Sequence, residues 1–147
     1  PNLINQWSLV GDGAMTLVAY ILAIHTCDET KLMQRGWKKR QSVKNVDRNK
    51  WDGKNQFSND IESLIKQTLA KHNSVSNWVR TTISGEANLM AITCNYGGSL
   101  LSIGIRNSGT QAKISVSARL EYGGNPNGIQ VTIDLVCQQL NNFMVIR

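Results

Sequence analysis

The stretch 112-AKISVSARLEY-122 alternates apolar and polar side chains without a break. Side chains of an extended chain point alternately to opposite faces, so the two sets separate. One face carries Ala112, Ile114, Val116, Ala118, Leu120 and Tyr122, and the other carries Lys113, Ser115, Ser117, Arg119 and Glu121. This pattern predicts a strand with one buried face and one face toward solvent.

The same alternation occurs on both sides of this stretch. Residues 129–137 repeat it, after the turn sequence Gly-Gly-Asn-Pro-Asn-Gly of residues 123–128. Residues 90–96 and 101–105 also alternate, with Gly97-Gly98 between them. We therefore predict an antiparallel meander over residues 88–140, with four strands, or five if residues 79–83 form another.

Two segments are candidates for helices. Ile61, Leu64, Ile65 and Leu69 form one apolar stripe, which predicts a helix over residues 59–72. Ser58, Asn59 and Asp60 are candidate N-caps, and Asn59 with Glu62 has capping-box spacing. The apolar run from Ala14 to about Thr26 fits a buried helix; alternatively, Asp12-Gly13 is a hairpin turn between strands at Trp7–Val10 and Thr16–Leu22, and we favour the helix.

The predicted fold class is α+β. An antiparallel sheet of four to five strands fills the C-terminal half, and one or two helices pack on its apolar face. The length of 147 residues fits a single domain, and 41% hydrophobic residues is an ordinary globular share. Residues 28–57, which combine glycines, Asn and Asp with many charges, are predicted to be irregular.

The start of the chain and its cysteines bear on the cellular compartment. Pro1 fits a chain that has lost its initiator Met and has no signal peptide, and the run from Ala14 to Ile24 is too short to cross a bilayer. Three cysteines, Cys27, Cys94 and Cys137, do not form a disulfide framework. We therefore expect a reducing, cytoplasmic location, with the nucleus as an alternative because of Lys38-Lys39-Arg40.

Positive charge is concentrated in one segment. The formal net charge is +6, and residues 31–54 alone carry nine basic residues against Asp47 and Asp52. The candidate binding residues in this basic band are Arg35, Trp37, Lys38, Lys39, Arg40, Lys44, Arg48, Lys50, Trp51 and Lys54. Such a band suits a polyanion, because phosphates require fixed positive charge and exposed Trp rings can stack on unpaired bases.

Alternatives to this binding site remain open. The basic band also fits a solvated loop that two tryptophans anchor to the core, or a contact with an anionic membrane surface. The polar face of the sheet adds Arg106, Lys113 and Arg119 beside Ser115, Ser117, Gln130 and Thr132. A hydroxyl-rich, mildly basic sheet face can bind RNA, but it is also typical of any sheet that faces solvent.

Other constellations carry weaker signals. His25 and Cys27 with Asp28 and Glu29 offer too few zinc ligands, and Cys94 and Cys137 fit buried thiols. Gly11-Asp12-Gly13 is weaker than any phosphate-binding fingerprint. At its first residue, Pro1, the chain resembles the tautomerase superfamily, and this resemblance would imply catalysis by a free proline amine. We predict no catalytic residue, metal, cofactor or small-molecule substrate.

The sequence thus favours a non-enzymatic nucleic-acid-binding protein that takes RNA or a single strand through its basic band. A viral accessory protein fits this description. One alternative is a self-assembling viral structural protein, matrix-like or coat-like, which forms homo-oligomers and contacts membrane or genome. Another is a small enzyme that uses the N-terminal proline.

Overall fold

The computed structural model describes residues 17–18, 20–22, 34–81, 83, 85–86 and 88–146. The chain divides into two compact units, Pro1–Gln34 and Arg35–Arg147. In the first unit, the described residues between 17 and 22 have helical backbone, as the helical interpretation predicts. Their side chains are exposed, whereas the sequence predicts a buried helix. The rest of this run, with His25, Cys27 and Pro1, lies outside the described residues.

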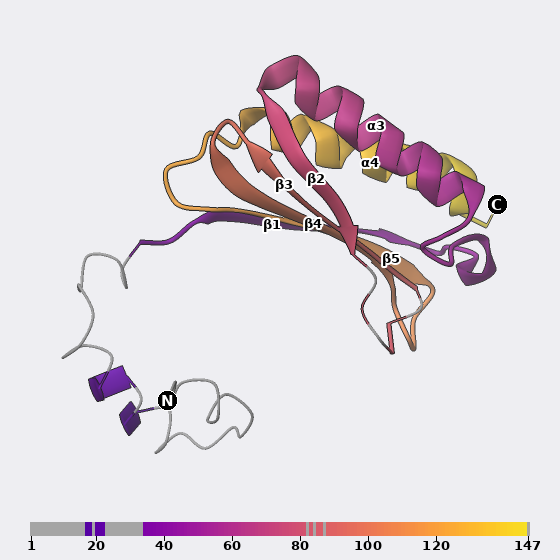
Figure 1. The fold of residues 1–147 in the computed structure, drawn as a ribbon. Coiled ribbons are helices and arrows are strands. Elements are labelled where there is room, and N and C mark those ends of the chain that lie inside the picture. Colours follow the sequence, from indigo (N-terminus) through magenta and orange to yellow (C-terminus); the bar gives the residue numbers. More distant parts are fainter. Residues whose placement is uncertain are drawn as a thin grey trace. The chain divides into compact units, whose positions relative to one another are not determined.

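The second unit contains a five-stranded antiparallel sheet (Figure 1). Its strands are β1 (Trp37–Lys44), β2 (Val75–Thr81), β3 (Leu89–Tyr96), β4 (Ser99–Asn107) and β5 (Lys113–Leu120). The spatial order is β1-β5-β4-β3-β2, so the first strand of the chain lies beside the last. The strands β3 to β5 are three of the four predicted from the alternating pattern, and β2 overlaps the optional strand at residues 79–83. The edges of the sheet are β1 and β2.

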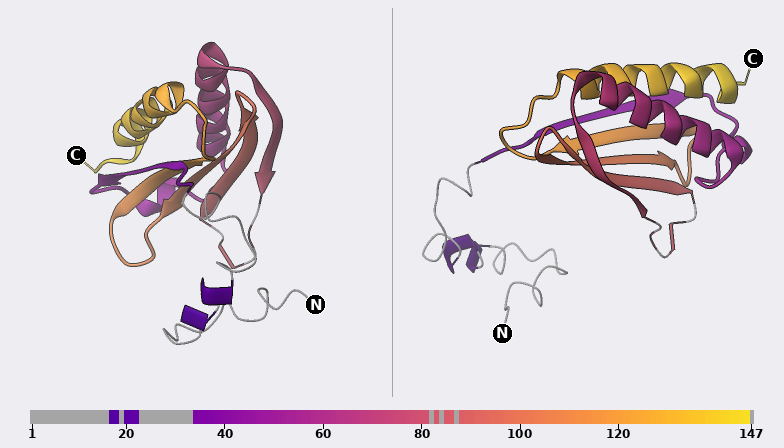
Figure 2. Two further views of the ribbon diagram at one scale, coloured as in Figure 1. Left: turned by 90° about the vertical axis from the view of Figure 1, so that its left-hand side faces the viewer. Right: turned by 45° about the horizontal axis from the view of Figure 1, so that its top comes forward.

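Two long helices cover one face of this sheet, as the side views show (Figure 2). They are α3 (Gln56–His72) and α4 (Asn127–Met144), and a short 3-10 helix, η2 (Arg48–Lys50), precedes α3. The N-cap of α3 is Asn55, whose side-chain oxygen accepts the Ser58 N–H at 2.9 Å. The predicted capping box is wrong, because Glu62 instead accepts a hydrogen bond from the Trp78 indole at 2.7 Å.

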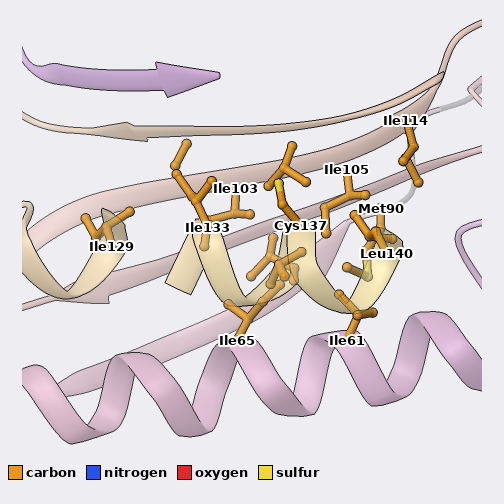
Figure 3. Packing of buried hydrophobic residues seen from close by; sticks show 14 of the residues in the cluster. Ile61, Ile65, Met90, Ile103, Ile105, Ile114, Ile129, Ile133, Cys137 and Leu140 are labelled. Atoms are coloured by element: carbon orange, nitrogen blue, oxygen red, sulfur yellow. The ribbon is translucent and has the colours of Figure 1, made fainter. Parts of the chain in front are cut away.

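The core lies between the two helices and the sheet (Figure 3). Ile61 and Ile65 of α3 meet the buried stripe of α4, which includes Ile133 and Leu140. The sheet contributes Met90 of β3, Ile103 and Ile105 of β4, and Ile114 of β5. The predicted α+β class and the apolar phase of the sheet are therefore confirmed.

The prediction that residues 129–137 form a strand is wrong. They belong to α4, in which Ile129, Ile133 and Val136 are buried while Val131 and Leu135 are exposed. In this segment, the buried apolar residues Ile129, Ile133 and Val136 are spaced by four and three residues, which is the spacing of a helix. Over the full length from Asn127 to Met144 only the helical period holds, and the buried stripe extends to Met144.

The prediction of irregular structure throughout residues 28–57 is also wrong. Residues Trp37–Lys44 form β1, which pairs with β5 over its whole length. Only Val43 of this strand is buried, while Trp37 and Gln41 are partly buried on the same side. An edge strand needs few apolar side chains, and charge on the others conceals its alternation.

The two described cysteines lie in the core. Cys94 of β3 and Cys137 of α4 are free thiols, and burial raises the pKa of each to about 11. The charge of Asp134 adds to the effect at Cys137. Thiols with raised pKa values react slowly, because the thiolate is the nucleophile.

We therefore expect a Cys27→Ser chain to remain unlabelled by a maleimide at pH 8 when folded and to gain two labels in urea. Both thiols keep their protons more tightly in the folded state. Their contribution to stability is complete below the ordinary pKa of 9.0 and is lost as the pH rises toward 11. The urea midpoint should accordingly fall between pH 8 and pH 10.5. Rapid labelling of the folded chain would contradict this assignment.

Candidate nucleic-acid interface

The sheet face opposite α3 and α4 is polar over β1 and β5, and its members follow from strand parity. In β5 the even-numbered residues Ile114, Val116 and Ala118 are buried toward the helices, so the odd-numbered ones point the other way. Residues opposite each other on paired strands share a face. The resulting open face carries Lys38, Arg40, Ser42 and Lys44 of β1, Lys113, Ser115, Ser117 and Arg119 of β5, Leu100, Ser102, Gly104 and Arg106 of β4, Leu89, Ala91, Thr93 and Asn95 of β3, and Val79 and Thr81 of β2.

Positive charges stand directly opposite one another across β1 and β5. Lys38 pairs with Arg119, and Lys44 pairs with Lys113. Like charges at opposing positions repel and destabilise a sheet. Arg40 lies between the two pairs on β1, so five cations occupy the β1–β5 half of the open face.

Hydroxyl groups fill the space between these cations. The side chain of Arg40 donates to Ser115 Oγ at 3.3 Å, and the hydroxyls of Ser42 and Ser115 lie 2.8 Å apart. Ser117 Oγ donates to the carbonyl of Gly104 at 3.3 Å, and a Cβ at position 104 would stand 3.2 Å from that hydroxyl. The centre of the open face is thus lined by small side chains, of which Ser115 is itself buried beside Arg40 and Ser42.

Few carboxylates stand near these charges. Among the described residues, the ion pairs are Arg80 with Glu62, on the helix side, and Arg106 with Glu86 at 3.1 Å. Glu121 follows β5, and its carboxylate accepts the Leu100 N–H at 3.2 Å. The five cations of β1 and β5 therefore form no ion pair within the described part of the chain.

The structure separates the basic band of the sequence into two groups. Lys38, Arg40 and Lys44 join the open face, whereas Lys39 lies on the helix side of β1 and is exposed. Arg35 precedes β1 and is exposed. The remaining cations, Arg48, Lys50 and Lys54, follow β1 in or near η2, and Lys50 Nζ donates to the carbonyl of Phe143 at 2.9 Å.

Neither described tryptophan of the basic band lies on the open face. Trp51 is 1% exposed and its indole N–H donates to the carbonyl of Asn88 at 3.1 Å, so the predicted stacking role for this ring is wrong. Trp37 is partly buried and packs against the core on the helix side. The alternative that the tryptophans anchor the segment to the core is the one that these positions favour.

The sequence predicts the strand that contains Lys113 and Arg119, but it does not predict that this strand pairs with β1. Their polar phase within residues 112–122 is visible, and so is the charge of residues 37–44. What no local pattern reveals is that these two segments pair. Gln130 and Thr132, predicted on the same face, instead lie on α4, where Thr132 is buried and donates to the carbonyl of Gly128.

Comparison with known proteins adds no assignment. The chain matches no protein-family model and no curated protein sequence. Within the described residues, no group of three or more potential ligands could hold a metal ion. None of the helices in that part of the chain is long and apolar enough to cross a membrane.

Proposed function

We propose that the open face binds the phosphate backbone of a nucleic acid, most readily RNA or another single strand. The observation that carries this proposal is the two like-charged cross-strand pairs, Lys38 with Arg119 and Lys44 with Lys113, which have no ion-pair partner among the described residues. Each such contact costs stability, on the order of 0.2–1 kcal/mol. A phosphate placed between the two cations removes the repulsion and replaces it with attraction on both sides.

The chemistry of the face points to backbone recognition rather than base recognition. Lysine and arginine neutralise phosphates, while the hydroxyls of Ser42 and Ser117 are donors and acceptors suited to sugar and phosphate oxygens. None of the described strand residues on this face is aromatic, so no ring is available for base stacking. We therefore propose binding with little sequence preference. The buried free thiols fit a reducing compartment such as the cytoplasm.

The test is a salt titration with a labelled 20-nucleotide single-stranded RNA of mixed sequence. If three to five phosphates are contacted, the slope of log affinity against log salt should be roughly −2 to −3.5. A duplex of equal length and phosphatidylserine vesicles are measured beside it. A slope near zero overturns phosphate binding, and vesicle binding without RNA binding assigns the face to a membrane surface instead.

A further inference from the structure

Within the described residues, no strand pairs with the outer edge of β1, and the phase of the ladder identifies the backbone groups that point outward there. The Glu121 N–H bonds to the Leu100 carbonyl, and the Ser108 N–H bonds to that of Lys113. Odd-numbered residues of β5 therefore direct their backbone groups toward β4, and even-numbered ones toward β1. Since Ser42 pairs with Ser115, the amides and carbonyls of residues 38, 40, 42 and 44 point away from β5.

This edge already accepts a backbone partner where β1 ends. Val46 forms an antiparallel bridge with Val145. The Asp47 N–H donates to the Met144 carbonyl at 2.8 Å, and the Ile146 N–H donates to the Asn45 carbonyl at 3.0 Å. Asn45 has a φ of 57°, which shifts the ladder phase just before this bridge. The residues that follow α4 thus already pair with the chain on this side, just beyond the end of β1.

The two edges of the sheet differ. The pairing of β2 with β3 is interrupted by a bulge between Ser76 and Val79, and Asn77 there has a φ of 51°. Bulges protect an edge from pairing with another strand. By contrast, β1 keeps an unbroken register over all eight residues and contains no proline. It is therefore the edge that is able to receive another strand.

We propose that the outer edge of β1 binds an extended acidic peptide, which adds to the sheet as a sixth strand. Lys38, Arg40 and Lys44 border this edge on the open face, and Lys39 borders it on the helix side. A second copy of β1 would place cations opposite cations, whereas Asp or Glu in a peptide forms favourable cross-strand pairs. Charge thus selects against self-pairing and in favour of an acidic strand.

A second observation supports a peptide at this position. The side-chain oxygen Oε1 of Gln41 is buried and has no hydrogen-bond partner in the described part of the chain. Gln41 lies on the helix side of the edge strand, between Lys39 and Val43. A hydroxyl side chain on an added strand, opposite Gln41, supplies the missing donor once the Gln41 amide turns toward the edge. Buried polar groups of folded proteins are rarely left unpaired.

The test uses a labelled ten-residue peptide that alternates Glu and Thr, measured by fluorescence anisotropy on the full chain. A peptide of equal composition with five Glu followed by five Thr is the control for simple charge attraction. The alternating peptide should bind about tenfold more tightly, because only it presents Glu on one face and Thr on the other. Equal binding of the two peptides, or no binding at millimolar concentration, overturns the proposal.

Substitutions at Ser42 separate the edge from the open face. Ser42→Pro removes an outward N–H without removing a ladder bond to β5, whereas Ser42→Ala removes only the hydroxyl. We expect the proline variant to lose about tenfold in peptide affinity and the alanine variant to keep it. Single-stranded RNA binding should fall equally in both variants, because both lose the Ser42 hydroxyl from the open face, whereas peptide binding should fall only in the proline variant, so the two proposals fail independently. Peptide binding that survives the proline overturns edge addition.

Hydrogen exchange on the unmodified chain avoids any dependence on the folding of a variant. Binding of the alternating peptide should slow amide exchange at residues 38, 40, 42 and 44, whose N–H groups point outward. The amides of residues 39, 41 and 43 point toward β5 and should change little. Protection without this alternation shows that the peptide lies elsewhere and ends the proposal.

Discussion

Trp51→Ala is expected to lower the free energy of unfolding by about 3–5 kcal/mol. The indole is 1% exposed and stands edge-to-face with Phe57, with ring centroids 6.2 Å apart. The indole N–H donates a hydrogen bond to the Asn88 carbonyl, and the backbone carbonyl of Trp51 accepts one from the Asn107 side-chain amide at 3.0 Å. Truncation leaves a cavity and an unsatisfied acceptor together. Urea denaturation followed by circular dichroism measures the loss.

Two matched variants separate packing from hydrogen bonding at this position. Trp51→Phe keeps an aromatic ring but removes the donor to Asn88, so we expect a smaller loss of about 1–3 kcal/mol. Trp37→Ala truncates a partly buried ring on the same side of the sheet and should also cost less than Trp51→Ala. If Trp51→Ala kept full stability but lost RNA affinity, the ring would be a binding group after all.

The two tryptophans illustrate what a charged sequence context hides. Both stand among lysines and arginines, a pattern that single-strand binding sites share with ordinary anchored loops. Burial depends on what packs above the ring, and for Trp51 that includes Asn88 and Phe57 from other parts of the fold. No spacing within residues 31–54 specifies those contacts. The sequence shows the aromatic residue but not its surroundings.

The fold was predictable where alternation had a single interpretation. Residues 112–122 contain polar residues at every second position, so only a strand satisfies them, and β5 is that strand. Residues 129–137 contain Val131 and Leu135 on what proves to be the outer side of α4. Because these two exposed residues are apolar, the sequence of a helix with one buried stripe looked like the alternating sequence of a strand. The continuation of the stripe to Met144 was the signal that a longer window would have used.

The basic residues of the candidate site were predictable from the sequence, but their proximity in the fold was not. Lys113 and Arg119 belong to a strand that the alternating pattern predicts, and Lys38 and Lys44 belong to a charge cluster that is visible in the sequence. Their meeting depends on β1 closing beside β5, across a sequence separation that includes three other strands. Long-range pairing of an edge strand leaves almost no trace in its own sequence, because most of its side chains face solvent.

The open face makes a prediction that an ordinary solvated surface does not. The double variant Lys38→Glu with Lys44→Glu should weaken single-stranded RNA binding by on the order of 100-fold at low salt, because two phosphate contacts become repulsive. The same variant converts both like-charged pairs into opposite-charged ones, with Arg119 and Lys113. We therefore expect its stability to rise, by about 1 kcal/mol in total. Affinity and stability should change in opposite directions.

The control is Lys54→Glu with Lys71→Glu, which changes the net charge equally. Lys54 belongs to the basic band but precedes α3, and Lys71 lies in the last turn of α3, away from the open face. If a particular surface binds the RNA, this control should lose less than about tenfold in affinity, through weaker long-range attraction alone. If net charge alone matters, both double variants lose affinity equally. That outcome, or a fall in stability of the Lys38/Lys44 variant, contradicts the assignment, because the repulsion across β1 and β5 is what the bound phosphates are proposed to relieve.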